Sequence, residues 1–270
     1  MRLDGKTIVI TGAAGGIGAA TAEIMADLGA DLGLIDVNPR VSERAQSIVA
    51  MGRRAAAAVC DIANADQAAA SIMELENRLG PIHGLVNNAG LVDNIAPLTR
   101  MELTAWRREL DVNLTGPFNM IRAVIEGMAA RRWGRIVNVS SAAARNGLLN
   151  QVGNAASKAG LLGLTHNVTL EYAARGITCN AVLPGLIETE KVRALPVGLI
   201  DRAIRLTPAR RLGEVREVGY LIAFLCSDQA GFINGAEIVI DGGAAMNPLS
   251  FGGRDREAEG DAARSLALPH

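Results

Sequence analysis

A glycine-rich segment near the amino terminus has the composition of a phosphate-binding turn. It reads Thr11-Gly12-Ala13-Ala14-Gly15-Gly16-Ile17-Gly18, after a short apolar run and before a run of helical composition. Glycine permits the unusual dihedrals of such a turn and a close approach of the main chain to a pyrophosphate, and the helix start offers free N–H groups to the anion. The segment indicates a dinucleotide site, although its spacing is not the GxGxxG form.

A carboxylate stands where a dinucleotide site contacts the adenosine ribose. Asp36 ends the second predicted strand, 18 residues past Gly18, and a carboxylate there can accept hydrogen bonds from both ribose hydroxyls. It would repel a 2′-phosphate, and no Lys or Arg in residues 13–17 offsets its charge, although Arg40 lies nearby. Asp36 can also cap the following helix, and the two roles can coexist. We therefore expect NAD rather than NADP.

The spacing TGxxxGxG, with four further motifs in order, resembles the short-chain dehydrogenase/reductase family. Those motifs are Asn87-Asn88-Ala89-Gly90, Asn113, Ser140-Ser141 and Pro184-Gly185, and Asp241-Gly242-Gly243 is also typical. The resemblance covers roughly residues 3–247. It implies an α/β fold, with a Rossmann-type, doubly wound, mainly parallel seven-stranded sheet and helices on both faces, in a single domain over residues 1–247.

The resemblance also implies which residues hold the cofactor. The glycine turn binds the pyrophosphate and Asp36 the ribose, while Lys158 contacts the nicotinamide ribose. Asp61 and Ile62 would contact the adenine, and Asn88, Ala89 and Gly90 would line the back of the cofactor cleft. In the segment after the sixth predicted strand, Thr189 would hydrogen-bond the nicotinamide carboxamide, and the other implied cofactor-binding residues are Pro184, Gly185 and Ile187.

The catalytic residues of the family are matched except at one position. In the family a Tyr protonates the carbonyl oxygen as hydride reaches carbon, a Lys four residues later lowers the pKa of that Tyr, a Ser orients the substrate and an Asn supports a water. Asn113, Ser141 and Lys158 match, but Asn154 stands at the Tyr position, thirteen residues after Ser141. An amide does not titrate near neutral pH, so Asn154 cannot be the acid, and the loss is worth about 10²–10⁴ in rate.

Two functions fit this pattern. The first is an NAD-dependent oxidoreductase that interconverts a secondary alcohol and a ketone, impaired here by Asn154, whether that residue is natural or introduced. The second is a non-catalytic NAD-binding or structural subunit that partners an intact homologue. Retention of Asn113, Ser141 and Lys158 favours the first. The tyrosines present, Tyr172 and Tyr220, fall in later helices and offer no replacement.

The segments around these motifs bear on substrate and assembly. Residues 186–212 fall where the family has its substrate lid, and their five arginines make an acidic or CoA-linked substrate conceivable. Leu148, Leu149 and Val152 suggest an apolar pocket wall and an apolar substrate. The resemblance and the small residues of the helix over 155–174 predict a homotetramer or dimer.

Alternating short apolar runs and longer helical runs predict the elements that position these residues. A bend is expected in the helical stretch 101–130 at Gly116-Pro117. Residues 248–270 lack an apolar period and predict a mobile tail or an arm that docks on a neighbouring subunit through Leu266 and Leu268. Strands are expected at 7–10, 31–35, 55–59, 83–86, 135–139, 178–183 and 237–240, and helices at 16–28, 41–51, 65–79, 101–130, 155–174 and 214–226.

Composition argues against other classes of function. The net charge is -1 with both signs interleaved, so we expect neither nucleic acid nor a membrane surface as partner. Three cysteines and three histidines are scattered, which predicts no metal site and buried thiols in a reducing compartment. No apolar run suits a signal sequence or a membrane span, and we expect a cytoplasmic protein.

Overall fold

A seven-stranded parallel sheet forms the centre of the molecule. The computed structural model describes residues 1–91 and 95–246, and its strands lie in the order β3-β2-β1-β4-β5-β6-β7. The doubly wound, Rossmann-like fold predicted from the sequence is thereby confirmed. The strands are β1 (Thr7–Thr11), β2 (Asp31–Asp36), β3 (Ala55–Val59), β4 (Gly84–Asn87), β5 (Gly134–Val139), β6 (Ile177–Pro184) and β7 (Glu237–Ile240).

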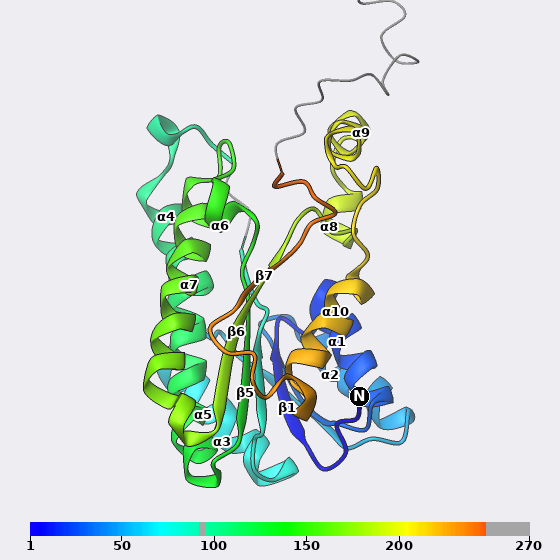
Figure 1. The fold of residues 1–270 in the computed structure, drawn as a ribbon, viewed down its shortest axis with the longest axis vertical. Helices are drawn as coiled ribbons and strands as arrows, with labels where there is room; N and C mark the ends of the chain where they lie inside the picture. Colours follow the sequence, from blue (N-terminus) through cyan, green and yellow to red (C-terminus); the bar gives the residue numbers. More distant parts are fainter. Residues whose placement is uncertain (92–94, 247–270) are drawn as a thin grey trace, which may run out of the picture.

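Helices cover both faces of this sheet (Figure 1). Helices α1, α2 and α10 lie on one face, and α3, α5 and α7 lie on the other. The helices are α1 (Gly16–Asp27), α2 (Val41–Ala50), α3 (Ala65–Leu79), α4 (Leu103–Leu110), α5 (Gly116–Arg131), α6 (Ala143–Asn146), α7 (Val152–Tyr172), α8 (Glu190–Arg193), α9 (Val197–Leu206) and α10 (Val215–Leu225).

Burial on both faces explains why the strands are continuous apolar runs. In β1, Ile8 and Ile10 pack into the core under α1, α2 and α10, whereas Val9, between them, packs into the core under α3, α5 and α7. Successive side chains of a strand point to opposite faces, so a strand covered on both sides must be apolar at every position. The two cores together fix the sheet that carries the site.

Two helices differ from their predicted bounds in ways that affect the site. Helix α7 begins at Val152 rather than at residue 155, so Asn154 lies inside its first turn. The expected bend at Gly116-Pro117 is instead a π-helical turn, Asp111–Thr115, directly before α5. Pro117 has no N–H to donate to the carbonyl of Asn113, which removes one ordinary i→i+4 bond and favours the wider turn.

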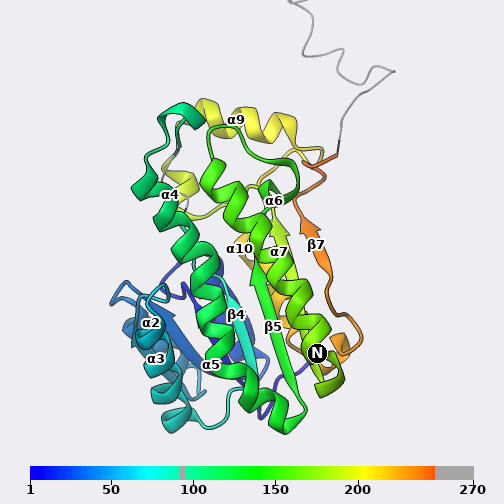
Figure 2. The same ribbon diagram turned by 90° about the vertical axis from the view of Figure 1, so that its left-hand side faces the viewer.

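The carboxyl ends of the parallel strands point toward α8 and α9 (Figure 2). Helix α9 contributes no buried residue. Within the described residues no helix has the length and apolar character needed to cross a membrane. The predicted tail, with Leu266 and Leu268, lies outside the described residues.

Candidate active site

The predicted site residues gather at one edge of the sheet. Gly12 follows β1, Asp36 ends β2, Asn88 follows β4, Ser141 follows β5 and Gly185 follows β6. Because these strands are parallel, their carboxyl ends meet along the same edge. Open α/β sheets bind ligands at this edge.

Hydrogen bonds hold the glycine turn closely against the segment after β4. The side-chain amide of Asn88 donates to the carbonyls of Thr11 (3.0 Å) and Gly12 (3.1 Å). The hydroxyl of Thr11 accepts from the main-chain N–H groups of Asn88 (3.0 Å) and Ala89 (3.1 Å). Gly12 has φ +65°, and a Cβ there would lie 2.8 Å from Cα of Ala89. Glycine is therefore required at position 12 by both conformation and space.

The start of α1 is available to an anion. Gly15 caps the helix without a side chain, and the first turn carries no acidic residue. Cγ2 of Thr189 lies 3.5 Å from the Cβ position of Gly16, so the segment after β6 lies close to the turn. A Cβ on Gly18 would lie 2.7 Å from the amide nitrogen of Asn88. The main-chain N–H groups and the helix dipole at this end suit a pyrophosphate.

The carboxylate of Asp36 is fixed beside the turn. It accepts hydrogen bonds from the main-chain N–H groups of Ala14 (2.9 Å) and Asn38 (2.9 Å). Nε of Arg44, on α2, donates to the carbonyl of Ala14 (3.2 Å), which adds a cation to this end of the site. The prediction that Asp36 caps the following helix is wrong, because α2 starts after Arg40 and has no side-chain capping bond. The carboxylate of Asp36 instead ties the glycine turn to the end of β2. Arg44 is a neighbour that the sequence analysis did not name.

The predicted adenine contacts differ from each other in exposure. Asp61 is exposed and its carboxylate accepts from the main-chain N–H of Ala63 (3.0 Å). Ile62 is buried, and its carbonyl accepts from the side-chain amide of Asn119 (3.0 Å). Ile62 also lies against Gly116, where a Cβ would come within 2.7 Å of its side chain.

Lys158 is buried between the ends of β4 and β5. Its Nζ donates to the carbonyl of Val139 (2.8 Å) and lies 3.3 Å from the Cβ position of Gly90. Burial lowers the pKa of Lys158 from 10.5 to about 8, because the charged form loses its hydration. The hydroxyl of Ser140 donates to the main-chain carbonyl of Lys158 (2.9 Å), which ties α7 to β5.

The side chain of Asn113 joins three segments of the site. Its Oδ1 accepts from the main-chain N–H of Leu91 (2.7 Å), and its Nδ2 donates to the carbonyl of Leu91 (3.0 Å) and to the hydroxyl of Ser157 (3.1 Å). The π-helical turn that carries Asn113 is thereby locked to α7 and to the segment after β4. Asn113 positions Lys158 indirectly, because Ser157 directly precedes it.

Asn154 lies in the first turn of α7 and is 4% exposed. Its Nδ2 donates to Oε1 of Gln151 (3.1 Å). Its Oδ1 is buried and has no hydrogen-bond partner among the described residues. The hydroxyl of Ser141, at the end of β5, accepts from the main-chain N–H of Ala143 (3.1 Å). Both side chains can offer polar atoms to a ligand at this edge.

The segment after β6 forms the remaining side of the site. Gly185 lies against Asp241, where a Cβ would come within 2.7 Å, and Pro184 pairs with Ile240 in the sheet. Ile187 is buried, and the hydroxyl of Thr189 caps α8 by accepting from the main-chain N–H of Val192 (3.3 Å). This segment leads into α8 and α9, which occupy the predicted lid. By contrast, Leu148 and Leu149, predicted to wall a pocket, are 52% and 86% exposed in the single chain.

Comparison with known proteins identifies the family. A family model described as enoyl-(acyl carrier protein) reductase matches residues 12–245. The 3-oxoacyl-(acyl-carrier-protein) reductase of Pseudomonas aeruginosa is 36% identical over 249 residues, which are 92% of this chain and all of the relative. Cis-4-hydroxycyclohexanecarboxylate dehydrogenase of Sinomonas cyclohexanicum is 38% identical over 238 residues, 88% of this chain and 96% of the relative. The chain belongs to the short-chain dehydrogenase/reductase family.

Solved structures of short-chain dehydrogenase/reductases agree with the fold. A gluconate 5-dehydrogenase from Burkholderia cenocepacia, in complex with NADP and tartrate, has a TM-score of 0.87 and 36% identity, covering 91% of this chain and 97% of that one. Levodione reductase has a TM-score of 0.87 and 32% identity, covering 90% and 99%. Members of this family are oxidoreductases that use a nicotinamide cofactor and act on small molecules, so the chain is of that general type.

The tyrosines of this short-chain dehydrogenase/reductase are engaged elsewhere. The hydroxyl of Tyr172 lies at the end of α7 and donates to Glu126 (3.0 Å). The hydroxyl of Tyr220, on α10, accepts from Arg216 (3.1 Å), and the residue is 50% exposed. His166 on α7 lies 3.1 Å from Oε1 of Glu237 on β7. The two tyrosine hydroxyls are thus bound to partners outside the candidate site.

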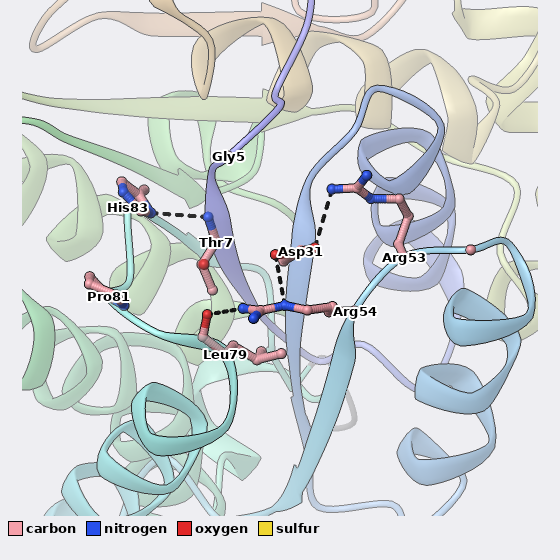
Figure 3. Close-up of a pocket in the computed structure, with 9 residues that line it drawn as sticks. Gly5, Thr7, Asp31, Arg53, Arg54, Leu79, Pro81 and His83 are labelled. Atoms are coloured by element: carbon pink, nitrogen blue, oxygen red, sulfur yellow. Dashed lines mark hydrogen bonds and ion pairs between the residues drawn. The ribbon is translucent and has the colours of Figure 1, made fainter.

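A cavity of about 490 Å³ lies at the opposite edge of the sheet, where the strands begin (Figure 3). The two guanidinium groups of Arg53 and Arg54 share the carboxylate of Asp31, at 3.2 Å and 3.1 Å. Arg53 also donates to the carbonyl of Ala30 (3.3 Å), and Arg54 to that of Leu79 at the end of α3. Cations at helix carboxyl ends stabilise the fold, so these arginines have a structural role.

Two residues at the site escaped the sequence analysis. Glu109 on α4 is buried, and Gln151 precedes α7 and accepts from Asn154. A signal was present for Glu109, because it stands four residues before Asn113 and therefore on the same helix face.

Proposed function

We propose that this chain is an NAD-dependent oxidoreductase that interconverts a secondary alcohol and a ketone by hydride transfer, with its rate reduced by Asn154. The observation that carries the proposal is the buried amine of Lys158, which lies one helical turn from Asn154 and between the ends of β4 and β5. Asn113 hydrogen-bonds the hydroxyl of Ser157, the residue before Lys158, and Ser141 follows β5.

The residues at this edge fit a dinucleotide. The Cβ position of Gly15, the N-cap of α1, has no atom within 4 Å, and the start of α1 supplies N–H groups to a pyrophosphate there. The nicotinamide ring, when bound, supplies or accepts the hydride. In the proposed mechanism Lys158 holds the nicotinamide ribose and Ser141 orients the substrate oxygen. The amide of Asn154 can donate a hydrogen bond to that oxygen but cannot release a proton to it.

Asp36 supports NAD as the cofactor. The two main-chain N–H groups that bind its carboxylate hold a negative charge in place at the end of β2. A 2′-phosphate at that point would meet this charge, although Arg44 nearby weakens the repulsion. We expect NAD(H) to bind about tenfold or more tightly than NADP(H), which corresponds to about 1.4 kcal/mol. Because the gluconate 5-dehydrogenase relative holds NADP, both cofactors need testing.

A small alcohol or ketone is the proposed substrate, apolar or linked to coenzyme A. Leu148, Leu149 and Val152, which lie between Ser141 and Asn154 in the sequence, support an apolar substrate. The relative acetoacetyl-CoA reductase of Cupriavidus necator, 34% identical over 239 residues, favours a thioester carrier. We also propose that the chain assembles as a homotetramer or dimer, as the resemblance implied.

The presence of Asn154 also fits a second function, that of a non-catalytic NAD-binding subunit. An amide at the proton donor's position is compatible with a subunit that binds NAD without turnover and partners an intact homologue. The two functions differ in one observable, which is whether the chain transfers hydride at all.

Isotope transfer tests the proposed function at low rates. The chain would be incubated for long times with NADH deuterated at C4 and a panel of ketones, including aromatic and CoA-linked ones. Mass spectrometry would then measure deuterium in the alcohol products. Deuterated alcohol from the unaltered chain supports the oxidoreductase. If neither the unaltered chain nor Asn154→Tyr gives deuterated alcohol while both bind NADH, the non-catalytic subunit is favoured.

A further inference from the structure

A carboxylic acid is buried beside the first turn of α7. Glu109, in the last turn of α4, is 3% exposed. A Cβ added to Gly153 would overlap Oε2 of Glu109 and would lie 3.1 Å from its carboxyl carbon. The carboxyl group therefore lies against the backbone of Gly153, the residue directly before Asn154. An ionisable group is thus one residue away from the position that we propose to lack an acid.

Glu109 and Gly153 fit each other as a pair. Any side chain at position 153 would occupy the volume of the Glu109 carboxyl group. Cε of Met101 closes the same space, 3.0 Å from that Cβ position. Burying a carboxyl group is costly compared with burying an apolar side chain of similar size. Glu109 is buried and lies against the residue before Asn154, so it is a candidate for function.

Asn154 provides the second observation. Its Oδ1 is buried and finds no hydrogen-bond donor within the described part of the chain, while its Nδ2 is used by Gln151. A buried acceptor of this kind favours a donor such as a water molecule. Asn154 directly follows Gly153, whose backbone lies against the Glu109 carboxyl group, so this oxygen and that carboxyl group belong to the same set of contacts at the start of α7.

The other charged groups nearby are less suited to proton transfer at this point. Lys158 faces the site from α7, but its Nζ is held by the carbonyl of Val139. Arg107, Arg108 and Asp111 flank Glu109 in sequence and are exposed. Asp36 is at the adenosine end, bound to Ala14 and Asn38.

We propose that Glu109 is the proton-transfer residue of this chain and acts through one water bound to Oδ1 of Asn154; this rests on the proposed oxidoreductase function. In ketone reduction, hydride from the nicotinamide cofactor forms the new C–H bond. An O–H bond of the water breaks as it protonates the carbonyl oxygen, and the carboxyl O–H of Glu109 breaks as it reprotonates the water. The products are alcohol, oxidised cofactor and the Glu109 carboxylate, which takes a proton from solvent. Alcohol oxidation runs the same steps in reverse.

The test compares Glu109→Gln with the unaltered chain in ketone reduction across pH. The unaltered chain should turn over slowly, and its rate should fall as rising pH removes the proton from Glu109. Glu109→Gln should be slower by about 10²-fold and should lose this pH dependence, because the amide carries no transferable proton. Glu102→Gln, which changes an exposed acid just before α4, is the matched control and should leave rate and pH profile unchanged.

Further variants separate this proposal from the proposed function. Calorimetry with NADH should show that Glu109→Gln binds cofactor like the unaltered chain, and Asn154→Tyr in that background should restore turnover. If Glu109→Gln misfolds, Glu109→Asp keeps the acid and should keep the pH dependence at a lower rate. Equal rates and pH profiles in the unaltered chain and Glu109→Gln would overturn the role of Glu109 alone, as would turnover seen only with Asn154→Tyr. If no form of the chain turns over substrate, including Asn154→Tyr, both the proposed function and this inference are overturned.

Discussion

Removal of the buried Lys158 ammonium should change how stability depends on pH. Lys158→Met keeps the length of the side chain and removes its charge. Burial lowers the pKa of this lysine from 10.5 to about 8 in the folded chain. That difference corresponds to about 3 kcal/mol, because one pKa unit is worth about 1.4 kcal/mol.

The sign follows from proton binding in the two states. Below about pH 8 both states hold the proton, and folding carries the full cost of burying the ammonium group. Between about pH 8 and 10.5 the unfolded chain still holds the proton while the folded chain has lost it, so the stability of the unaltered chain rises with pH. The cost is therefore relieved as pH rises, and Lys158→Met should not share this gain.

Urea unfolding measures the effect. The free energy of unfolding of the unaltered chain, relative to Lys158→Met, should rise by about 2–3 kcal/mol between about pH 7 and about pH 10. Lys191→Met changes an exposed lysine and serves as control, with no such difference expected. A constant difference between the unaltered chain and Lys158→Met over this range would refute the assignment of Lys158 as a buried, strongly desolvated amine.

Other residues give shorter tests. Gly12→Ala should destabilise the fold by about 1–3 kcal/mol and weaken NADH binding, because φ at this residue is +65° and the new Cβ would overlap Ala89. Thermal unfolding measures the loss of stability and calorimetry measures the affinity for NADH. An unchanged affinity would contradict the role of the glycine turn in cofactor binding. Asp36→Asn should reduce the preference for NADH over NADPH, measured by titration of both cofactors, and an unaltered ratio would remove Asp36 from cofactor selection. Light scattering at micromolar concentration should show an oligomer, and a species of only 28.2 kDa would refute the proposed assembly.

Local patterns made much of the fold and the cofactor edge predictable. The glycine turn, the strand before it and the helix after it are adjacent in sequence, so their motif specifies their geometry directly. The parallel direction of the strands follows from alternating β and α segments, since parallel neighbours require crossovers. The doubly wound arrangement was implied by the family resemblance. The first turn of α7 was missed because Gln151 makes no side-chain capping bond, so the sequence carries no start signal before residue 155.

Contacts between segments that are distant in the sequence could not be predicted from local patterns. The position of Glu109 against Gly153 depends on how α4 and α7 rotate about their axes, and no local pattern encodes that rotation. The same holds for Asn113, which joins Leu91 to Ser157 across three segments. The π-helical turn was anticipated only as a bend, although Pro117 and its missing N–H were visible in the sequence.

A comparison of Asn154→Tyr with Asn154→Phe tests the central claim most directly. Both variants add a ring at the same position of α7, and they differ only in the hydroxyl group that can transfer a proton near Lys158. With NAD and a secondary alcohol that the chain accepts, NADH formation should be faster in the Tyr form by about 10²-fold or more than in the Phe form and the unaltered chain. Equal rates in the Tyr and Phe forms, with both binding NAD, would contradict the claim that one missing proton donor limits this site.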